Sequence, residues 1–238
     1  MLNVRLYEIF TSIEGEGVLF GTKTLFVRLA GCPFGCYYCD TEEALPADSG
    51  EEHTMEEACR MIDDAIQPNT YKVNFTGGEP LVQHEAVAGM ARHVQSSGVP
   101  TYLESSCYDA DRFRTVIPHI DIVKVEFKTA DSAFVEEGQH PRIVRSATEC
   151  LRAAVDLGRE TYIKVVAGEG TKPGPFAELV GGIFSEVSND DISGFVIQPV
   201  TGPGAPTLDA LLELHDIVRP YSNKVRVIPQ LHKAIGAP

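Results

Sequence analysis

The chain has 238 residues, 43% of them hydrophobic, and its 34 acidic against 20 basic residues give a formal net charge of −14. This length suits one sizeable hydrophobic core, so we expect a single domain over residues 1–238. The negative charge disfavours direct nucleic-acid binding, because it repels a phosphate backbone. The apolar runs are too short to span a membrane, and the N-terminal "MLNVRLYEIF" does not resemble a signal peptide. We therefore expect a cytoplasmic protein.

Apolar, β-branched runs alternate with helix-like segments along the chain. The predicted strands cover residues 24–30, 71–76, 100–105, 121–127, 161–166 and 194–200, with a late candidate at 224–229. The predicted helices cover residues 54–67, 84–97, 143–158, 175–188 and 207–220. Thr54, with Glu57 three positions on, predicts a capped start for the first helix, and Thr207 does the same for the last without the matching acid.

Strand and helix alternate about six times, which predicts an α/β fold of parallel strands joined by right-handed crossovers. Six units are too few to close an eight-stranded barrel. We therefore expect a partial (open) TIM-like barrel of about six parallel strands. The segment 101–125 contains only a short helical stretch, "DADRFRTVIPHI", so some crossover helices are expected to be abbreviated.

In such folds the chemistry gathers on the loops that follow the carboxyl ends of the strands. The unusual residues of this sequence fall on those loops and therefore at one end of the sheet. The loops are "GCPFGCYYCDT", "GGEP", "SSC", "KTADS", "AGEG" and "TGPG".

The first of these loops holds Cys32, Cys36 and Cys39, close enough for three sulfurs to surround one small inorganic group. Three interpretations compete. A redox pair of Cys36 and Cys39 leaves Cys32 unused, and a structural zinc site needs a fourth ligand, for which His53 is the nearest histidine. An iron–sulfur cluster is held by thiolates at such spacings. The other cysteines are expected to be ordinary small residues, buried or half-buried: Cys59, Cys107 and Cys150.

The spacing C-x3-C-x-aromatic-C, with Tyr38 in the aromatic place, resembles that of the radical S-adenosylmethionine enzymes. The resemblance implies a 4Fe-4S cluster on three cysteines, with S-adenosylmethionine bound at the fourth iron. It also implies that Gly77, Gly78 and Glu79, in "TGGEP", bind the methionine ammonium of that cofactor. A tight Gly-Gly turn before a helix that opens at Pro80 is the purely structural interpretation, and the two are compatible.

The stretch "YEIFTSIEGEGVLFGTKTLFVRLAGCPFGCYYCDT", together with "TGGEPLVQ", "IQPV" and "PQLHKAIGAP", resembles the 7-carboxy-7-deazaguanine synthases. The resemblance implies a lyase that converts 6-carboxy-5,6,7,8-tetrahydropterin to 7-carboxy-7-deazaguanine with loss of ammonia, on the way to queuosine or archaeosine in tRNA. It further implies Mg2+, a flavodoxin-like electron donor and a homodimer. The alternatives are a glycyl-radical-enzyme activating enzyme and, from another class, a non-catalytic metal-binding module.

Residue roles follow from the same resemblance. The implied pterin contacts are Glu14, Gly15, Glu16, Arg28, Thr76, His232, Lys233 and Pro238. The implied Mg2+ ligand is Thr41, with Asp40 as an outer-shell acceptor. The implied S-adenosylmethionine contacts are Tyr38, Gly77, Gly78, Glu79, Glu104, Ser105, Ser106, Lys128 and Gln198.

Simpler interpretations compete for some of these residues. Arg28 could form a salt bridge at the rim of the barrel, Asp40 could form an Asx turn, and the segment ending at Pro238 could be a frayed tail. The sequence also departs from the family pattern in four places: Glu14 stands for Gln, Tyr38 for Trp, "ESSC" for an "ETNG"-like text and Glu126 for Asp. None of these departures affects the cluster cysteines.

Overall fold

The computed structural model describes residues 2–132 and 138–237. Nine strands form one sheet in the order β3-β1-β2-β4-β5-β6-β7-β8-β9. The parallel strands are β2 (Lys23–Leu29), β4 (Lys72–Gly77), β5 (Thr101–Ser105), β6 (Ile122–Phe127), β7 (Glu160–Ala167), β8 (Gly194–Pro199) and β9 (Val225–Val227). The expectation of a partial, open barrel of parallel strands is confirmed.

The sheet has more strands than predicted because an antiparallel edge precedes the parallel strands. Strand β1 (Asn3–Ile13) pairs with β2, and β3 (Glu51–Thr54) pairs with β1. A register shift between Leu6 and Glu8 interrupts the alternation of β1, and β3 is short and polar, so neither gives a clear strand pattern. The late candidate at 224–229 is confirmed as β9.

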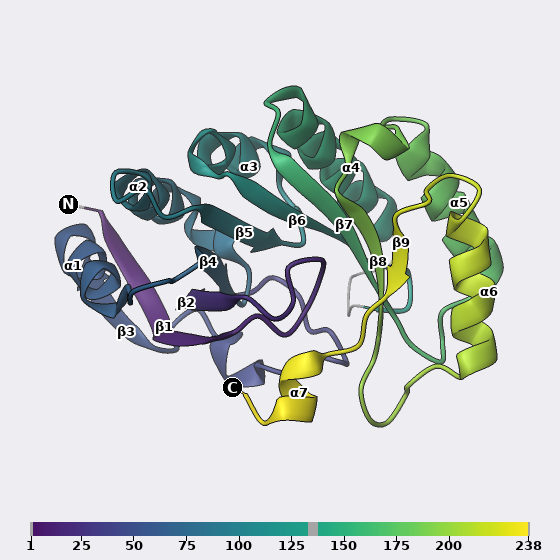
Figure 1. Ribbon diagram of the computed structural model, residues 1–238, viewed down its shortest axis with the longest axis horizontal. Coiled ribbons are helices and arrows are strands. Elements are labelled where there is room, and N and C mark those ends of the chain that lie inside the picture. The colour runs from purple at the N-terminus through teal and green to yellow at the C-terminus, as the bar shows by residue number, and fades with distance from the viewer. Residues whose placement is uncertain (1, 133–137, 238) are drawn as a thin grey trace.

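Figure 1 shows the helices in an arc outside the curved sheet, with α7 apart from them on the open side. The helices are α1 (Met55–Ala65), α2 (His84–Gln95), α3 (Ala110–Val116), α4 (His140–Asp156), α5 (Pro173–Phe184), α6 (Leu208–Val218) and α7 (Leu231–Ile235). Short 3-10 turns occur at Glu42–Ala44, Pro80–Gln83, Ile117–His119 and Asn189–Asp191. Thr54 and Glu57 form the predicted capping box, and α3 is the abbreviated crossover helix.

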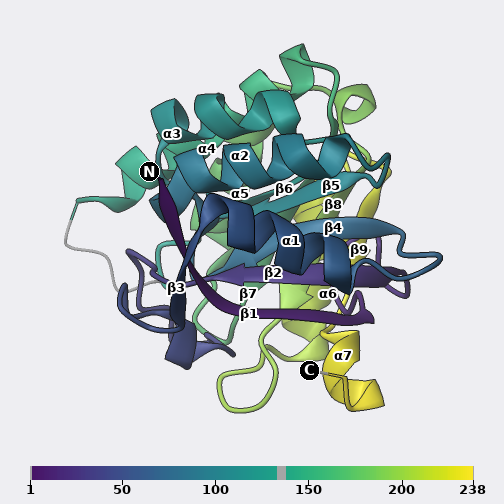
Figure 2. The ribbon, with the colours of Figure 1, turned by 90° about the vertical axis from the view of Figure 1, so that its left-hand side faces the viewer.

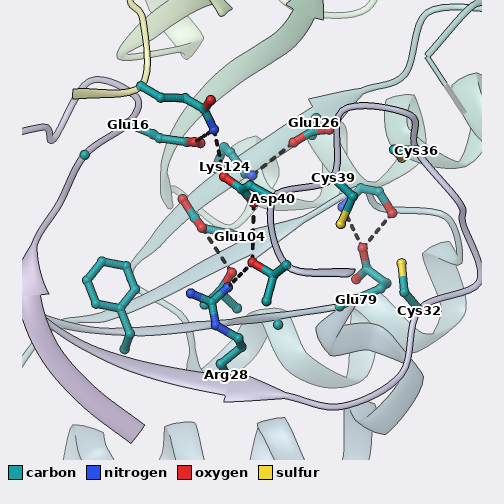
Figure 3. Close-up of a pocket in the computed structure, with 18 of the residues that line it drawn as sticks. Glu16, Arg28, Cys32, Cys36, Cys39, Asp40, Glu79, Glu104, Lys124 and Glu126 are labelled. Atoms are coloured by element: carbon teal, nitrogen blue, oxygen red, sulfur yellow. Dashed lines mark hydrogen bonds and ion pairs between the residues drawn. The ribbon is translucent and has the colours of Figure 1, made fainter. Parts of the chain in front are cut away.

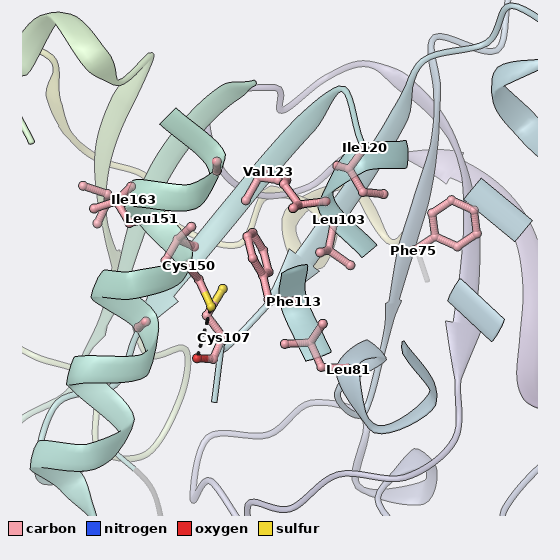
Figure 4. Packing of buried hydrophobic residues seen from close by; sticks show 14 of the residues in the cluster. Phe75, Leu81, Leu103, Cys107, Phe113, Ile120, Val123, Cys150, Leu151 and Ile163 are labelled. Atoms are coloured by element: carbon pink, nitrogen blue, oxygen red, sulfur yellow. Dashed lines mark hydrogen bonds between the residues drawn. The ribbon is translucent and has the colours of Figure 1, made fainter. Parts of the chain in front are cut away.

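The main hydrophobic core lies between the sheet and helices α1 to α6, which cover one face of the sheet (Figure 2). Successive strand residues point to opposite faces, so Val123 and Val125 of β6 enter this core while Lys124 and Glu126 face the inside of the barrel. Figure 4 shows Phe113 of α3 packed among core side chains. The alternation therefore places a buried apolar face outside and a polar face inside.

The floor of the barrel is closed by the loop between β1 and β2, residues 14–22. Val18 and Leu19 of this loop pack on a small second core made of Tyr102, Ile122, Tyr162, Val196 and Ile228. Gly17 has φ +66°, and a Cβ atom there would lie 2.0 Å from the hydroxyl of Tyr162. Only glycine allows the loop to approach the floor so closely.

Cys107 and Cys150 are fully buried in the main core and Cys59 is half-buried, as predicted for all three. The thiol of Cys150 donates to the carbonyl of Cys107 at 3.7 Å (Figure 4). Cys107 has φ +54°, in the left-handed region that favours glycine.

Candidate active site

A cavity of about 670 Å³ opens at the carboxyl ends of the parallel strands. Its lining includes nearly all the residues to which the sequence assigned a role, together with Phe10, Phe26, Lys124, Lys164 and Gln230. Figure 3 shows the three cysteines on one side of this cavity and Glu16 and Arg28 on the other. The volume lies within the usual range for ligand sites. The loops predicted to meet at one end of the sheet therefore do meet there.

The cysteine loop is held against the "GGEP" loop by backbone hydrogen bonds. The amides of Gly78 and Glu79 donate to the carbonyls of Leu29 and Gly31 at 3.0 and 2.8 Å. A Cβ atom on Gly78 would lie 2.4 Å from the carbonyl oxygen of Gly31 and 3.0 Å from the Cβ of Cys32. The second glycine of "GGEP" is therefore required by the close approach of the two loops.

The thiols of Cys32, Cys36 and Cys39 are free and half-buried. Burial raises the pKa of Cys32 to about 12 and also raises the pKa of Cys39. Thiolates there need a positively charged partner, and a 4Fe-4S cluster binds thiolates, of which three leave one iron open to another ligand. The residues present fit the cluster.

Glu79 is fixed by hydrogen bonds to both of its carboxylate oxygens. Ser105 donates its hydroxyl at 2.7 Å to one oxygen, and Ser106 donates its amide and hydroxyl at 2.8 and 2.6 Å to the other. The amide of Leu81 also donates to Glu79 at 3.0 Å. In this structure Ser105 and Ser106 orient Glu79, and their predicted contact with the ribose of S-adenosylmethionine stays a prediction.

Lys128 joins the end of β6 to the cysteine loop. Its ammonium pairs with Glu126 and donates to the hydroxyl of Tyr38 at 3.2 Å. Burial opposes the charge on Lys128, but the carboxylate of Glu126 outweighs it and raises the pKa of Lys128 well above its usual range. A fixed cation beside the cluster loop suits an anionic group such as the methionine carboxylate.

The opposite wall of the cavity carries the residues predicted to face the pterin. Arg28 donates from Nε to Glu8 at 2.7 Å and from Nη1 to the hydroxyl of Thr41 at 3.1 Å. Its guanidinium also lies 5.5 Å from the ring centre of Phe10, which stacks on Phe26 at 5.0 Å. Arg28 therefore forms the predicted rim salt bridge and lines the cavity at the same time.

Asp40, Glu16 and His232 come together from the cysteine loop, the floor loop and α7. Each offers one atom suited to a metal, and these atoms lie within 4.8 Å of one another. Gln230 donates to Glu16 at 2.9 Å and to Asp40 at 2.8 Å. Burial opposes the charge on Asp40, but His232, whose Nε2 lies 3.7 Å from Oδ2 of Asp40, and nearby lysines outweigh it, so the pKa of Asp40 lies well below its usual range. The carboxylate of Asp40 in turn raises the pKa of His232.

Glu14 lies at the bottom of the cavity, 3% exposed, and pairs with the fully buried Lys72 at 2.9 Å. Lys72 also donates to Thr24 at 2.7 Å. Burial, together with the charge of Glu104, raises the pKa of Glu14 to about 7 although Lys72 acts in the other direction. Glu14 lines the cavity, and its contact with the pterin stays a prediction.

The remaining predicted residues are placed as follows. Gly15 packs on α7, where a Cβ atom would lie 2.5 Å from the Cβ of His232. Thr76 donates to Glu104 at 3.2 Å on the inner face of the sheet. Gln198 and Lys233 line the cavity. Pro238 lies outside the described residues.

Several residues that line the cavity were missed from the sequence. Lys124 and Lys164 interrupt the apolar strands "DIVKVEF" and "TYIKVV", and a lysine in a buried strand was a signal that could have identified them. Phe10 and Phe26 face each other across an antiparallel strand pair that the sequence did not predict. Gln230 lies in the text "PQLHK" but had no assigned role.

The fold and the thiol loop together define a radical S-adenosylmethionine enzyme. Residues 13–146 match the family described as "4Fe-4S single cluster domain", which covers more than half of the chain. Across the described residues, no helix is both long and apolar enough to cross a membrane.

The chain is 31% identical to the 7-carboxy-7-deazaguanine synthase of Methanocaldococcus jannaschii over 96% of this chain and 98% of that protein. It is 29% identical to the enzyme of the same name from Methanothermobacter thermautotrophicus, with 99% and 98% of the two chains covered. The crystal structure of QueE from Escherichia coli has the same fold, with a TM-score of 0.66 at 20% identity over 98% of this chain and 96% of that one. This chain belongs to the 7-carboxy-7-deazaguanine synthase family.

Proposed function

We propose that this protein converts 6-carboxy-5,6,7,8-tetrahydropterin to 7-carboxy-7-deazaguanine with loss of ammonia. The observation that carries the proposal is that one cavity is lined by the three free cysteines and by Glu16, Arg28 and His232. An enzyme that rearranges a small molecule by radical chemistry must hold cofactor and substrate in contact and away from water.

Cys32, Cys36 and Cys39 would hold the cluster. When bound, the cluster and S-adenosylmethionine supply the radical that takes a hydrogen atom from the pterin. The chain's own contribution is to fix the cofactor: Glu79 presents a carboxylate to the ammonium group, and Lys128 presents a cation to the carboxylate group.

The opposite wall would bind the pterin. The stacked rings of Phe10 and Phe26 offer an apolar surface to a flat heterocycle, while Arg28 offers a cation to its carboxylate. Glu16 and His232 supply hydrogen-bonding groups around the ring. A carboxylate that attracts Arg28 would also release the hydroxyl of Thr41 from its present hydrogen bond.

That release supports a Mg2+ ion on Thr41 with Asp40 nearby, since Mg2+ prefers oxygen ligands and commonly borrows oxygens from a substrate. Mn2+ can replace Mg2+ as a spectroscopic probe. Electron paramagnetic resonance should show tight Mn2+ binding only when the pterin is present. Thr41→Val should weaken that binding, and an unaffected Mn2+ affinity would exclude Thr41 as a ligand.

The central experiment reconstitutes the protein with iron and sulfide without oxygen, reduces it with dithionite, and adds S-adenosylmethionine and the pterin. Mass spectrometry should detect 7-carboxy-7-deazaguanine. The Cys36→Ser variant should form no product. The control variant Cys59→Ser, which changes a cysteine outside the cavity, should still form it. Cofactor cleavage without any product from this pterin would contradict the proposed substrate.

Two partners and one location complete the proposal. A flavodoxin-like protein would supply electrons, the chain would form a homodimer, and it would act in the cytoplasm. The support for these three statements is the family resemblance. Reduction by a purified flavodoxin tests the electron donor, and sedimentation analysis tests the homodimer.

A further inference from the structure

Two buried lysines inside the barrel have no role in the motifs discussed so far. Lys124 of β6 is 6% exposed and Lys164 of β7 is 4% exposed. Burying an ammonium group is costly unless carboxylates surround it. The partners of these lysines therefore indicate what the lysines do.

Lys164 contacts two carboxylates that belong to different parts of the site. Its Nζ lies 2.5 Å from Oε2 of Glu16, on the floor loop at the pterin wall, and 3.6 Å from Oε2 of Glu126, at the end of β6. Both oxygens are therefore at most about 6 Å apart. Two carboxylates at that separation repel each other unless a cation lies between them.

The contacts continue from Glu126 to the cluster loop. Glu126 pairs with Lys128, which donates to the hydroxyl of Tyr38 at 3.2 Å. Burial opposes the charge on Glu126, but Lys128, Lys124 and Lys164 together outweigh it and hold the pKa of Glu126 well below its usual range. A chain of charged contacts therefore runs from Glu16 through Lys164 to the loop that carries the cysteines.

Lys124 can be compared with Lys164, because both lysines pair with Glu126. The ammonium of Lys124 lies 3.1 Å from Oε2 of Glu126. Of the ion pairs among the described residues, only those of Lys164 connect the floor loop with β6. Figure 3 shows Lys124 joined to Glu126 by a dashed line, with Glu16 at the left of the view. The two lysines are thus alike in burial and differ in what they join.

We propose that Lys164 is a positioning residue that fixes Glu16 relative to Glu126, and thereby aligns the pterin with the place where S-adenosylmethionine is cleaved. This inference rests on the proposed function. Lys164 stands on a central parallel strand, so its backbone is held firmly. A displacement of about 1 Å between reacting groups can cost on the order of 100-fold in rate, so a rigid link between the two subsites matters.

Lys164→Met keeps most of the side-chain length and removes the charge. Glu16 and Glu126 should then move apart, and the pterin should bind in a less defined position. We expect kcat/KM for the pterin to fall on the order of 10- to 100-fold. We also expect more 5'-deoxyadenosine per molecule of product, because the cofactor is still cleaved while hydrogen transfer from the pterin becomes less efficient. Lys164→Arg should restore much of this coupling.

The assay uses the reconstituted holoenzyme with dithionite as the reductant, and it measures KM for each substrate and the ratio of 5'-deoxyadenosine to product. Lys124→Met should raise the pterin KM less than Lys164→Met does. Lys23→Met, outside the cavity, should match the wild-type protein. An unchanged ratio and an unchanged pterin KM in Lys164→Met would overturn the inference.

Iron content and circular dichroism report whether each variant is folded and loaded. If Lys164→Met takes up no cluster, Glu126→Gln tests the same link from its other end, and a wild-type ratio in that variant would overturn the inference too. If the wild-type protein makes no product from the pterin, the proposed function itself fails. The two failures are therefore distinguishable.

Discussion

The buried pair of Glu14 and Lys72 makes the stability of the fold depend on pH in a way that can be measured. Burial raises the pKa of Glu14 from 4.5 to about 7, with the charge of Glu104 acting in the same direction and Lys72 against it. A folded state with a raised carboxyl pKa binds its proton more tightly than the unfolded chain does. The stabilisation is therefore complete below the unfolded pKa of 4.5 and is lost as the pH rises through about 7.

The size of this effect follows from the two pKa values. With 4.5 in the unfolded chain and about 7 in the folded one, proton linkage reduces the free energy of unfolding by about 2.5 kcal/mol between pH 5 and pH 8. Glu14→Gln removes the titrating group. The difference in unfolding free energy between wild type and Glu14→Gln should therefore fall by about 2.5 kcal/mol over that range.

Urea unfolding of the cluster-free chain, followed by circular dichroism at several pH values, measures this difference. Glu213→Gln, an exposed position on α6, is the matched control and should differ from wild type by the same amount at each pH. Parallel pH curves for wild type and Glu14→Gln would refute the reasoning, because they would show that Glu14 titrates alike in the folded and unfolded chain.

Three further predictions concern the floor, the cluster and the pterin wall. Gly17→Ala should destabilise the fold by about 2–5 kcal/mol in a thermal melt, because about 1–2 kcal/mol of backbone strain at φ +66° adds to a clash of its Cβ with Tyr162, whereas Gly98→Ala, at φ +75° in open space, should cost only the strain of about 1–2 kcal/mol. Cys36→Ser should reduce the iron bound per chain and the broad visible absorption, and full iron content would contradict the assignment. Phe26→Ala should weaken pterin binding by about 1 kcal/mol in calorimetry while leaving S-adenosylmethionine binding unchanged, and equal loss for both ligands would contradict an aromatic pterin wall.

The parallel strands and their loops could be predicted because their signals are local. A strand buried on both faces has a run of β-branched apolar residues in its sequence. A loop that closely approaches another backbone needs glycine, as at Gly78. The cysteine spacing likewise lies within eight residues. These local signals predicted the fold class and the end of the sheet at which the cavity lies. The assignment of the cysteines to a cluster and of the other cavity residues to ligands came from the family resemblance.

The features that escaped prediction depend on contacts between distant segments. Lys164 and Glu16 are 148 positions apart, and their pairing requires the floor loop to reach β7. The stacked pair of Phe10 and Phe26 requires the register of an edge strand whose alternation is interrupted. Ser105 donates to Glu79 because of the loop geometry around it. The text "ESSC" does not reveal that geometry.

The floor loop has a consequence for changing this enzyme by directed evolution. Within residues 14–22, Val18 and Leu19 close the floor of the barrel, and Glu16, two positions before Val18, lines the cavity. Substitutions selected in this loop for another heterocycle would also disturb the packing around Tyr162. New specificity should therefore appear together with compensating changes on the inner faces of β5, β6 and β7, at positions that no ligand touches.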